Sequence, residues 1–234
     1  MLISFILFCI SSTIFSFYGT KLRIAKYYPK AAYSTIVEPF CGAAQYSLFG
    51  DNWKKEVILY DKDPIIAGVW LYLIQANKHD ILSLPDVAIG DNLDNYKQLS
   101  TDERSLMGFY INTASAMPKK TVMKRSIWNR KKIDIANNLY KVAHWVVGCK
   151  DYRDISYNTK CTWFIDPPYF DGGKYYRMNN SKINYWDLGE WCKSREGQVI
   201  VCENTKADWL PFKPLVEMNG QLHKTMEAVW IKEK

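Results

Sequence analysis

The stretch that decides the fold is TWFIDPPYF, from Thr162 to Phe170, in which an apolar run leads into an acid, two prolines and two aromatic residues. An apolar run of this length, closed by prolines, predicts a buried strand over residues 162–165. In an open α/β sheet, ligands bind in the crevice beyond the carboxyl ends of the strands. We therefore expect Asp166 to lie at the edge of a binding crevice.

The chemistry of this motif suits methylation of an exocyclic amine. Because proline has no N–H and a fixed φ, Pro167 and Pro168 are expected to present their carbonyl groups outward as rigid, uncommitted acceptors. Asp166 and the Pro167 carbonyl could then accept both hydrogens of an amine such as N6 of adenine, and Asp166 could take the departing proton. Tyr169 is expected to stack on the planar base. In the alternative interpretation, Asp166 only caps the following turn.

A second motif, VEPFCGAA from Val37 to Ala44, predicts a strand that leads into a glycine-containing turn and a helix, the arrangement that cradles nucleotide-like cofactors. The next predicted strand ends on Asp61, and an acid at this offset typically accepts ribose hydroxyl groups. Asp63 competes for that role, although an acid followed by Pro64 is typical of a helix N-cap. A turn and a ribose acid without a phosphate motif favour S-adenosylmethionine over a dinucleotide.

Short apolar runs alternate with helical patterns along the chain, which predicts βαβ units around a mostly parallel sheet. We expect the other strands at residues 35–40, 57–60, 144–148, 198–202, 214–218 and 228–232. Helices are expected from about Ala44, from Pro64, from a capping box at Ser100 and Glu103 to about Met117, and over residues 129–143.

Composition permits a polyanionic partner without demonstrating one. The 234 residues carry a net charge of +7, and 15% of them are aromatic, which suits either base stacking or a large aromatic core. The six cysteines form no CxxC pair and the three histidines are far apart, so we expect no metal and a reduced compartment.

Residues 1–15 are interpreted as an N-terminal extension whose last residues pack as an edge element of the domain. The segment from Met1 to Phe17 is apolar, but it has no basic start and no small-residue cleavage site, so it is a poor signal peptide. It is also short for a membrane span, and no membrane association is expected, although the basic residues that follow leave an anchor open as an alternative.

Residues 77–143 are predicted to form an inserted helical lobe, and residues 16–76 and 144–234 the catalytic domain. The insertion is too long for a simple crossover, and it contains no acid from Ser105 to Ile133. A run of one charge sign is often only a solvated face, but beside the 162–170 motif it favours contacts with DNA phosphates. The candidate contacts in this lobe are Lys119, Lys120, Lys124, Arg125 and Arg130.

With these motifs in place, the chain from about Phe17 to its C-terminus resembles the Dam-like class of DNA adenine-N6 methyltransferases, especially the compact phage and bacterial members. The resemblance implies a Rossmann-like S-adenosylmethionine-dependent methyltransferase fold, α/β, with a seven-stranded mixed sheet, a C-terminal antiparallel hairpin and an inserted helical target-recognition lobe. It implies a site-specific enzyme that transfers methyl from S-adenosylmethionine to a flipped-out adenine in double-stranded DNA. A monomer in the cytoplasm of a bacterial or phage-infected cell is expected.

The resemblance also implies roles for individual residues. The family's N-terminal segment matches SFYGTKLRIAKYYP, which implies that Tyr18 and Lys21 approach the cofactor and the target base. The family's glycine turn matches VEPFCG, which implies that Phe40, Cys41 and Gly42 line the cofactor. YDKDP puts Asp61 on the ribose, and GCKDYRDI implies that Asp151 and Tyr152 contact the cofactor adenine.

Three positions depart from the family pattern. Ala44 stands where the second glycine of the turn is usual, Thr20 replaces a glycine before Lys21, and Lys150 separates the usual glycine from Asp151. We expect an alanine at the turn to crowd the cofactor slightly, which affects affinity more than fold.

The segment after the motif, from Asp171 to Arg177, has two glycines before a basic and aromatic stretch. We interpret it as a mobile loop that closes over the flipped base, with Lys174, Tyr176 and Arg177 as DNA contacts, or as an ordinary surface loop. Two other functions stay open: methylation of another amine (cytosine N4, RNA adenine or protein glutamine), and an inactive prophage-derived protein that binds DNA or cofactor.

Overall fold

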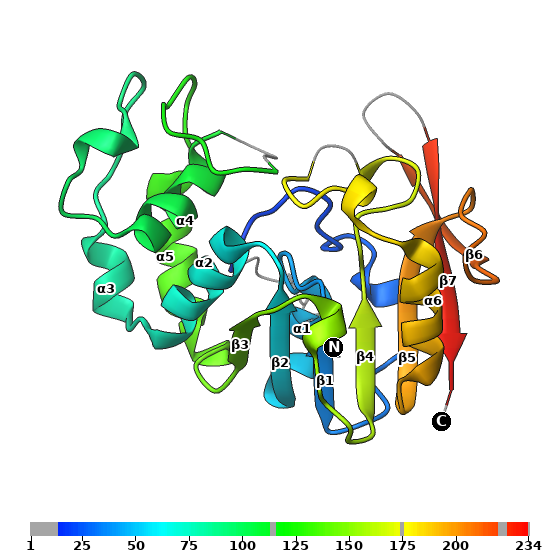
Figure 1. The fold of residues 1–234 in the computed structure, drawn as a ribbon. Coiled ribbons are helices and arrows are strands. Elements are labelled where there is room, and N and C mark those ends of the chain that lie inside the picture. Colours follow the sequence, from blue (N-terminus) through cyan, green and yellow to red (C-terminus); the bar gives the residue numbers. More distant parts are fainter. Residues whose placement is uncertain (1–13, 113–115, 174–175, 220–223, 234) are drawn as a thin grey trace, which may run out of the picture.

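A seven-stranded mixed sheet is the centre of the fold (Figure 1). The computed structural model describes residues 14–112, 116–173, 176–219 and 224–233. The strand order is β3-β2-β1-β4-β5-β7-β6, in which only the pairs made by β7 are antiparallel. The strands are β1 (Thr35–Glu38), β2 (Glu56–Asp61), β3 (Val146–Cys149), β4 (Cys161–Ile165), β5 (Gly197–Asn204), β6 (Lys213–Asn219) and β7 (Lys224–Lys232). The expected α/β class, with a C-terminal antiparallel hairpin, is confirmed.

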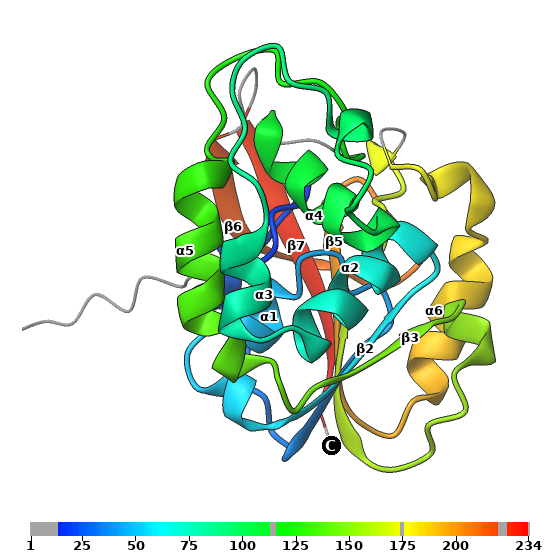
Figure 2. The ribbon, with the colours of Figure 1, turned by 90° about the vertical axis from the view of Figure 1, so that its left-hand side faces the viewer.

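Helices cover both faces of this sheet. Figure 2 shows α6 on one side and the other α-helices on the opposite side. They are α1 (Gln45–Leu48), α2 (Pro64–Gln75), α3 (Lys78–Ser83), α4 (Thr101–Ile111), α5 (Trp128–Asn138) and α6 (Tyr185–Ser194). The predicted caps are present: Asp63 caps α2, and Ser100 and Glu103 form a capping box on α4.

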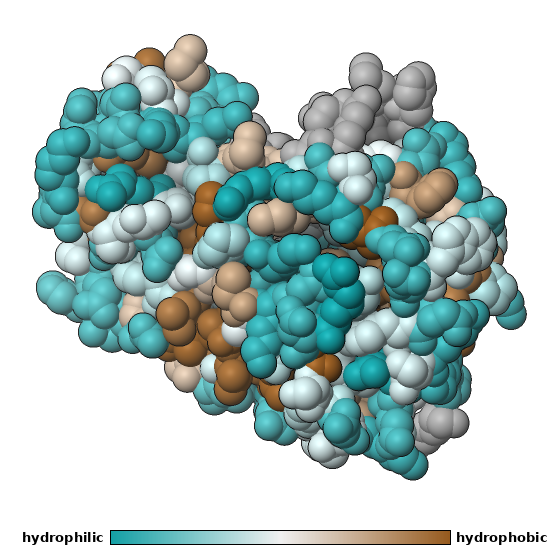
Figure 3. All heavy atoms as spheres, viewed as in Figure 1, coloured by the Kyte–Doolittle hydropathy of each residue, from teal (hydrophilic) through white to brown (hydrophobic). Residues whose placement is uncertain are grey.

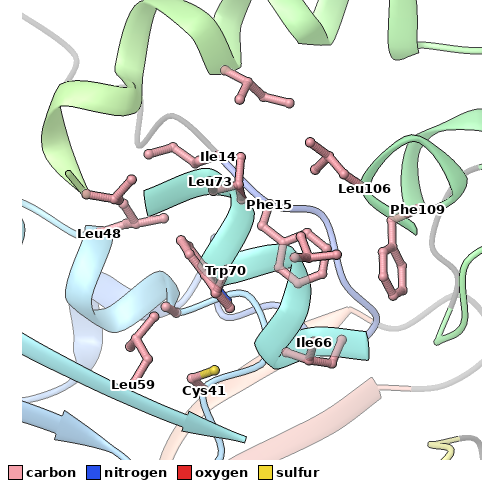
Figure 4. Close-up of a cluster of buried hydrophobic side chains, with 14 of the residues drawn as sticks. Ile14, Phe15, Cys41, Leu48, Leu59, Ile66, Trp70, Leu73, Leu106 and Phe109 are labelled. Atoms are coloured by element: carbon pink, nitrogen blue, oxygen red, sulfur yellow. The ribbon is translucent and has the colours of Figure 1, made fainter. Parts of the chain in front are cut away.

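Alternate residues of the strands face the two helical layers, as the period of a strand requires. Trp163 and Ile165 of β4 pack in the cluster on the α6 side, whereas Phe164 packs in the larger cluster on the other side. In that larger cluster, Trp70 of α2 and Phe109 of α4 lie around Phe15 (Figure 4). Ile14 and Phe15 are fully buried there and form no strand. The rest of the expected N-terminal extension, residues 1–13, lies outside the described residues.

Two long loops of the 77–143 segment pair with each other. Leu93 N–H donates to the Lys120 carbonyl at 2.8 Å, and Val122 N–H donates to the Asp91 carbonyl at 2.9 Å. The paired loops project on the same side of the molecule as the carboxyl ends of the parallel strands (Figure 1). Helix α4 ends at Ile111 rather than near Met117, because the Asn112 amide turns back to donate to the Thr121 carbonyl.

The register of β7 places one acid beside the Asp-Pro-Pro-Tyr motif that follows β4. Asn204, the last residue of β5, pairs with Glu227 of β7. Glu227 therefore lies next to the carboxyl end of a parallel strand although it comes near the amino end of its own. No helix among the described residues is long and apolar enough to cross a membrane.

Candidate active site

One pocket is lined by residues of several motifs that lie far apart in the sequence. Its walls come from the 17–21 segment, the turn after β1, the ends of β2 and β3, the start of the loop after β4, and residues 176–183. It lies beyond the carboxyl ends of the parallel strands, and Figure 3 shows the surface hollowed along this upper edge. All eight residues expected to bind the cofactor line it: Tyr18, Lys21, Phe40, Cys41, Gly42, Asp61, Asp151 and Tyr152.

Asp166 lies on the floor of this pocket, directly after β4. Its Oδ1 atom is 3.0 Å from the Nζ atom of Lys21, and both side chains are mostly buried. The Pro167 carbonyl accepts no hydrogen bond from the described part of the chain. The Pro168 carbonyl, by contrast, accepts a hydrogen bond from the Tyr185 hydroxyl, so the expectation that both proline carbonyls are uncommitted is wrong for Pro168. The strand end thus offers one carboxylate and one carbonyl.

Tyr169 is held by its hydroxyl group as well as by its ring. The hydroxyl accepts a hydrogen bond from Lys21 and donates one to Oε1 of Glu227 at 2.5 Å. The same Oε1 atom accepts a hydrogen bond from the Tyr28 hydroxyl at 2.6 Å and lies 3.3 Å from Lys21 Nζ. Sequence reasoning missed Glu227; its only signal was a lone acid preceding the apolar run AVWI.

Burial and neighbouring charges set the protonation of this cluster. Burial raises the pKa of Asp166 to about 6, against the lowering effect of the Lys21 charge. Burial alone would lower the pKa of Lys21, but the charges of Asp166 and Glu227 together raise it above its ordinary value. Lys21 is therefore a fixed cation at neutral pH, while Asp166 is ionised and close enough to its pKa to take a proton.

The turn after β1 approaches the pocket with two left-handed residues. Gly42 has φ 44°, and a Cβ there would meet the Phe17 ring at 3.2 Å. Ala44, which precedes α1, has φ 46° and ψ 41°, a conformation that costs an L-residue about 1–2 kcal/mol. The departure from glycine at this position therefore strains the backbone of the turn.

Asp61 joins this turn to the end of β2. Its Oδ2 atom accepts from the Gly42 N–H at 3.2 Å, and its Oδ1 atom accepts from the Asp63 N–H at 2.9 Å. Burial raises the pKa of Asp61 to about 6. Oδ2 also accepts from the Cys41 thiol at 3.9 Å, whereas Oδ1 keeps a second lone pair, so the group can accept a further hydrogen bond from a ligand. Asp63 caps α2 by accepting from the Ile65 N–H at 3.0 Å, which confirms that it is the cap.

Glu38 is a second pocket acid that sequence reasoning missed. It ends β1 and is only 2% exposed, with its Oε1 atom accepting from the backbone N–H of Ser47 at 3.0 Å and from the hydroxyl of the same residue. Burial raises its pKa to about 8, so it is largely protonated at neutral pH. Its position inside an apolar strand, VEPF, was the only signal in the sequence.

Asp151 and Tyr152 form the far wall. Asp151 is bound on both oxygens by Arg153, and Lys62 Nζ lies 2.7 Å from its Oδ2 atom, so its pKa is lowered. The Tyr152 ring lies 5.6 Å from the Phe40 ring, measured between centroids. Two aromatic rings and a charged acceptor thus come together beyond the ends of β1 and β3.

Two of the three loop residues expected to contact DNA lie against this pocket. The Nη1 atom of Arg177 is 2.7 Å from Oδ1 of Asp63. The hydroxyl of Tyr176 approaches the Tyr18 carbonyl at 3.4 Å and packs against Gly19, where it leaves no room for a Cβ. In this conformation both side chains are part of the pocket wall. Lys174 lies outside the described residues.

The basic residues of the paired loops are exposed. Lys120 is bound to Asp94 at 2.8 Å, and Lys131 and Lys132 of α5 pair with Asp134 and Asp86. The other four cations of the 77–143 lobe that are expected to contact DNA have no acidic partner within the described ranges; they are Lys119, Lys124, Arg125 and Arg130. The described residues also contain no group of three or more potential ligands that could hold a metal ion.

Comparison with known proteins gives likeness at the level of solved structures. No family model matches the sequence, and no curated protein matches it. An Escherichia coli protein described as a "putative methyltransferase" has a TM-score of 0.38 at 8% identity, over 85% of this chain and 75% of that one. A Haemophilus influenzae protein described as a "putative methylase" has a TM-score of 0.35 at 10% identity, over 86% and 80%. At these values neither likeness bears on activity, which has to be inferred from the site.

Proposed function

We propose that this chain is an S-adenosylmethionine-dependent methyltransferase that acts on N6 of adenine in DNA. The observation that carries the proposal is that a single pocket joins Asp166, with its Lys21 partner, to the turn at Gly42 and the acid at Asp61. An acceptor amine at Asp166 and a cofactor on the turn would therefore share one enclosed space.

The residues of the pocket fit S-adenosylmethionine. Asp61 has a lone pair left on Oδ1 for a ribose hydroxyl group, and Phe40 and Tyr152 offer aromatic faces for an adenine ring. Glu38 is buried and shifted toward its neutral form, and an ammonium group placed beside it would favour its ionised form. Bound there, S-adenosylmethionine supplies a methyl group on a positively charged sulfur.

The catalytic motif fits an exocyclic amine. Asp166 can accept one amine N–H, and the uncommitted Pro167 carbonyl can accept the other. With its pKa near 6, Asp166 is ionised at neutral pH and can hold the proton that the amine loses. Lys21 holds the carboxylate in place but keeps its own proton, so it positions Asp166 without acting as the base.

The proposal that duplex DNA is the substrate rests on the positive surface charge of the paired loops. The paired loops carry exposed cations and project on the same side of the molecule as the carboxyl ends of the parallel strands, beyond which the pocket lies (Figure 1). Cations there would neutralise phosphates and give a salt-dependent affinity. Because N6 of adenine lies inside the duplex, the base has to rotate out of the stack to reach Asp166.

The test is transfer of labelled methyl from S-adenosylmethionine to duplex DNA with varied adenine contexts, to RNA and to protein, followed by nucleoside and amino-acid analysis. We expect label in N6-methyladenine of DNA, and at least a 100-fold lower rate in D166N, since general-base catalysis contributes about 10²–10⁴-fold. D51N is the matched control, because Asp51 is an exposed acid in the segment that precedes the amino end of β2. Label in cytosine, RNA or glutamine would replace the proposed acceptor, and no transfer at all would contradict methyl transfer.

A further inference from the structure

Glu227 is a buried carboxylate that reaches the active site from the last strand. It is 6% exposed and lies beside the end of β5, where it contacts Lys21 of the pocket lining. One of its oxygens, Oε1, accepts hydrogen bonds from Tyr28 and Tyr169 and lies within ion-pair distance of Lys21. An acid with this much desolvation and three donors on one atom is expensive to bury unless all its partners are in place.

Two of the three partners of Glu227, Lys21 and Tyr169, belong to the proposed acceptor site. Lys21 holds Asp166, and Tyr169 belongs to the catalytic motif. The Lys21 ammonium also lies 4.5 Å from the centre of the Tyr169 ring, so lysine and ring are fixed relative to each other. By binding both, Glu227 fixes the direction of the Tyr169 ring and the position of the ammonium.

The second consequence of the position of Glu227 concerns the charge that acts on Asp166. With both carboxylates ionised, Asp166 and Glu227 share the single ammonium of Lys21, at 3.0 Å and 3.3 Å. A cation shared between two acids stabilises each of them less than it would stabilise one alone, and the like charge of Glu227 opposes the ionisation of Asp166. Without Glu227, the Lys21 charge would act on Asp166 alone and lower its pKa, although burial would still raise it.

We propose that Glu227 is a positioning residue of this active site, which fixes Lys21 and the Tyr169 hydroxyl and, by sharing the Lys21 charge, keeps Asp166 basic enough to accept a proton. The proposal rests on the proposed function for its catalytic meaning, but the charge sharing is a property of the protein alone. The other ionisable groups coupled to Asp166 are Tyr28, Glu38, Tyr169, Tyr176, Cys202 and Glu203. All six remain in E227Q, so the comparison with the wild-type protein isolates the charge of Glu227.

The decisive experiment is a direct titration of Asp166 by carbon NMR, on the whole protein with ¹³C-labelled aspartate and with D166N to assign the signal. E227Q keeps the shape and the acceptor oxygen but removes the charge. We expect its Asp166 midpoint to fall by roughly one pH unit below the wild-type value. Y28F is the matched control, because it removes one hydrogen bond to the same oxygen and no charge; its midpoint should not move. An unchanged midpoint in E227Q, or an equal fall in Y28F, would overturn the proposal.

Activity gives the second readout and separates this proposal from the function. If methyl transfer to DNA is found, the acidic limb of the single-turnover pH–rate profile should move down in E227Q by the same amount as the NMR midpoint. If the wild-type protein transfers no methyl group, the proposed function fails and the NMR titration still decides the charge sharing. If E227Q does not fold, E227D retains the charge and should keep the midpoint near the wild-type value; a fall in E227D would count against charge as the cause.

Discussion

The Nζ atom of Lys21 lies 3.0 Å from Oδ1 of Asp166, which joins a segment near the start of the chain to the Asp-Pro-Pro-Tyr motif after β4. The Lys21 ammonium is the single cation within ion-pair distance of Asp166 among the described residues. The Lys21 charge therefore opposes the rise in pKa that burial causes at Asp166.

Replacing Lys21 should move the pH dependence of activity upward. In K21M, burial and the charge of Glu227 remain and both raise the pKa of Asp166, so the carboxyl is protonated at neutral pH. We expect at least a 100-fold lower transfer rate at pH 7, with partial recovery as the pH rises, because the acidic limb moves to higher pH. The measurement is a single-turnover pH–rate profile. K26M, at an exposed lysine of the same segment, should match the wild type; an acidic limb in K21M that stays put or moves down would contradict the assignment.

The motifs at strand ends could be predicted because their signals are local. An apolar run followed by Asp-Pro-Pro, or by a glycine turn, fixes which residues stand at the carboxyl end of a strand, and all parallel strand ends meet at one edge. Helix α6 is absent from the sequence-based prediction, although its signal is also local: its buried residues Tyr185, Leu188 and Cys192 have helical spacing after the Asn184 cap.

The contacts between distant segments could not be predicted in the same way. Glu227 reaches Tyr169 only because β7 runs antiparallel beside β5 in one particular register, and nothing local to EAVWI specifies that register. Arg177 likewise meets Asp63 only through the path of the loop after β4. The end of α4 was misplaced for a related reason, because Asn112 bonds to the second long loop rather than continuing the helix.

Ala44 offers a test of backbone strain in the cofactor turn. Because an alanine at φ 46° is strained and glycine is not, A44G should raise the free energy of unfolding by about 1 kcal/mol. For a chain of this size that corresponds to an increase in Tm of roughly 2–4 °C. Thermal unfolding followed by circular dichroism measures it. Ala43 has no positive φ, so A43G is the matched control and should lower Tm. A lower Tm in A44G as well would show that the alanine methyl group stabilises the turn by more than the strain costs.

Glu38 should make stability depend on pH. Its folded pKa of about 8 lies above the ordinary value of 4.5, so the folded protein binds this proton more tightly than the unfolded chain does. The resulting stability is fully present below about 4.5 and is lost as the pH rises toward 8. E38Q cannot titrate and its amide oxygen can still accept from Ser47, so its Tm should fall less between pH 5 and 8 than that of the wild type. Asp61, Asp166 and Glu203 have the same sign and remain in both proteins, which makes the difference between the two curves specific to Glu38. If Tm depends on pH in the same way in both proteins, the ionisation of Glu38 does not reduce the stability of the fold.

The ion pair between Arg177 and Asp63 links the loop after β4 to the first turn of α2, across the wall of the pocket. If this pair holds the wall in place over a bound cofactor, R177Q should release S-adenosylmethionine several-fold faster, with a smaller effect on binding, in stopped-flow measurements. D63N should do the same, and the double variant should be no faster than either single one, because the two changes remove one interaction. D63N should also lower Tm, since Asp63 is the cap of α2, whereas R177Q should not. K193Q is the control: it breaks an exposed ion pair on α6 and should change neither the release rate nor the binding rate of S-adenosylmethionine. Additive effects of R177Q and D63N on the release rate would show that the two residues act separately, and an unchanged rate in R177Q would show that the loop does not hold the cofactor.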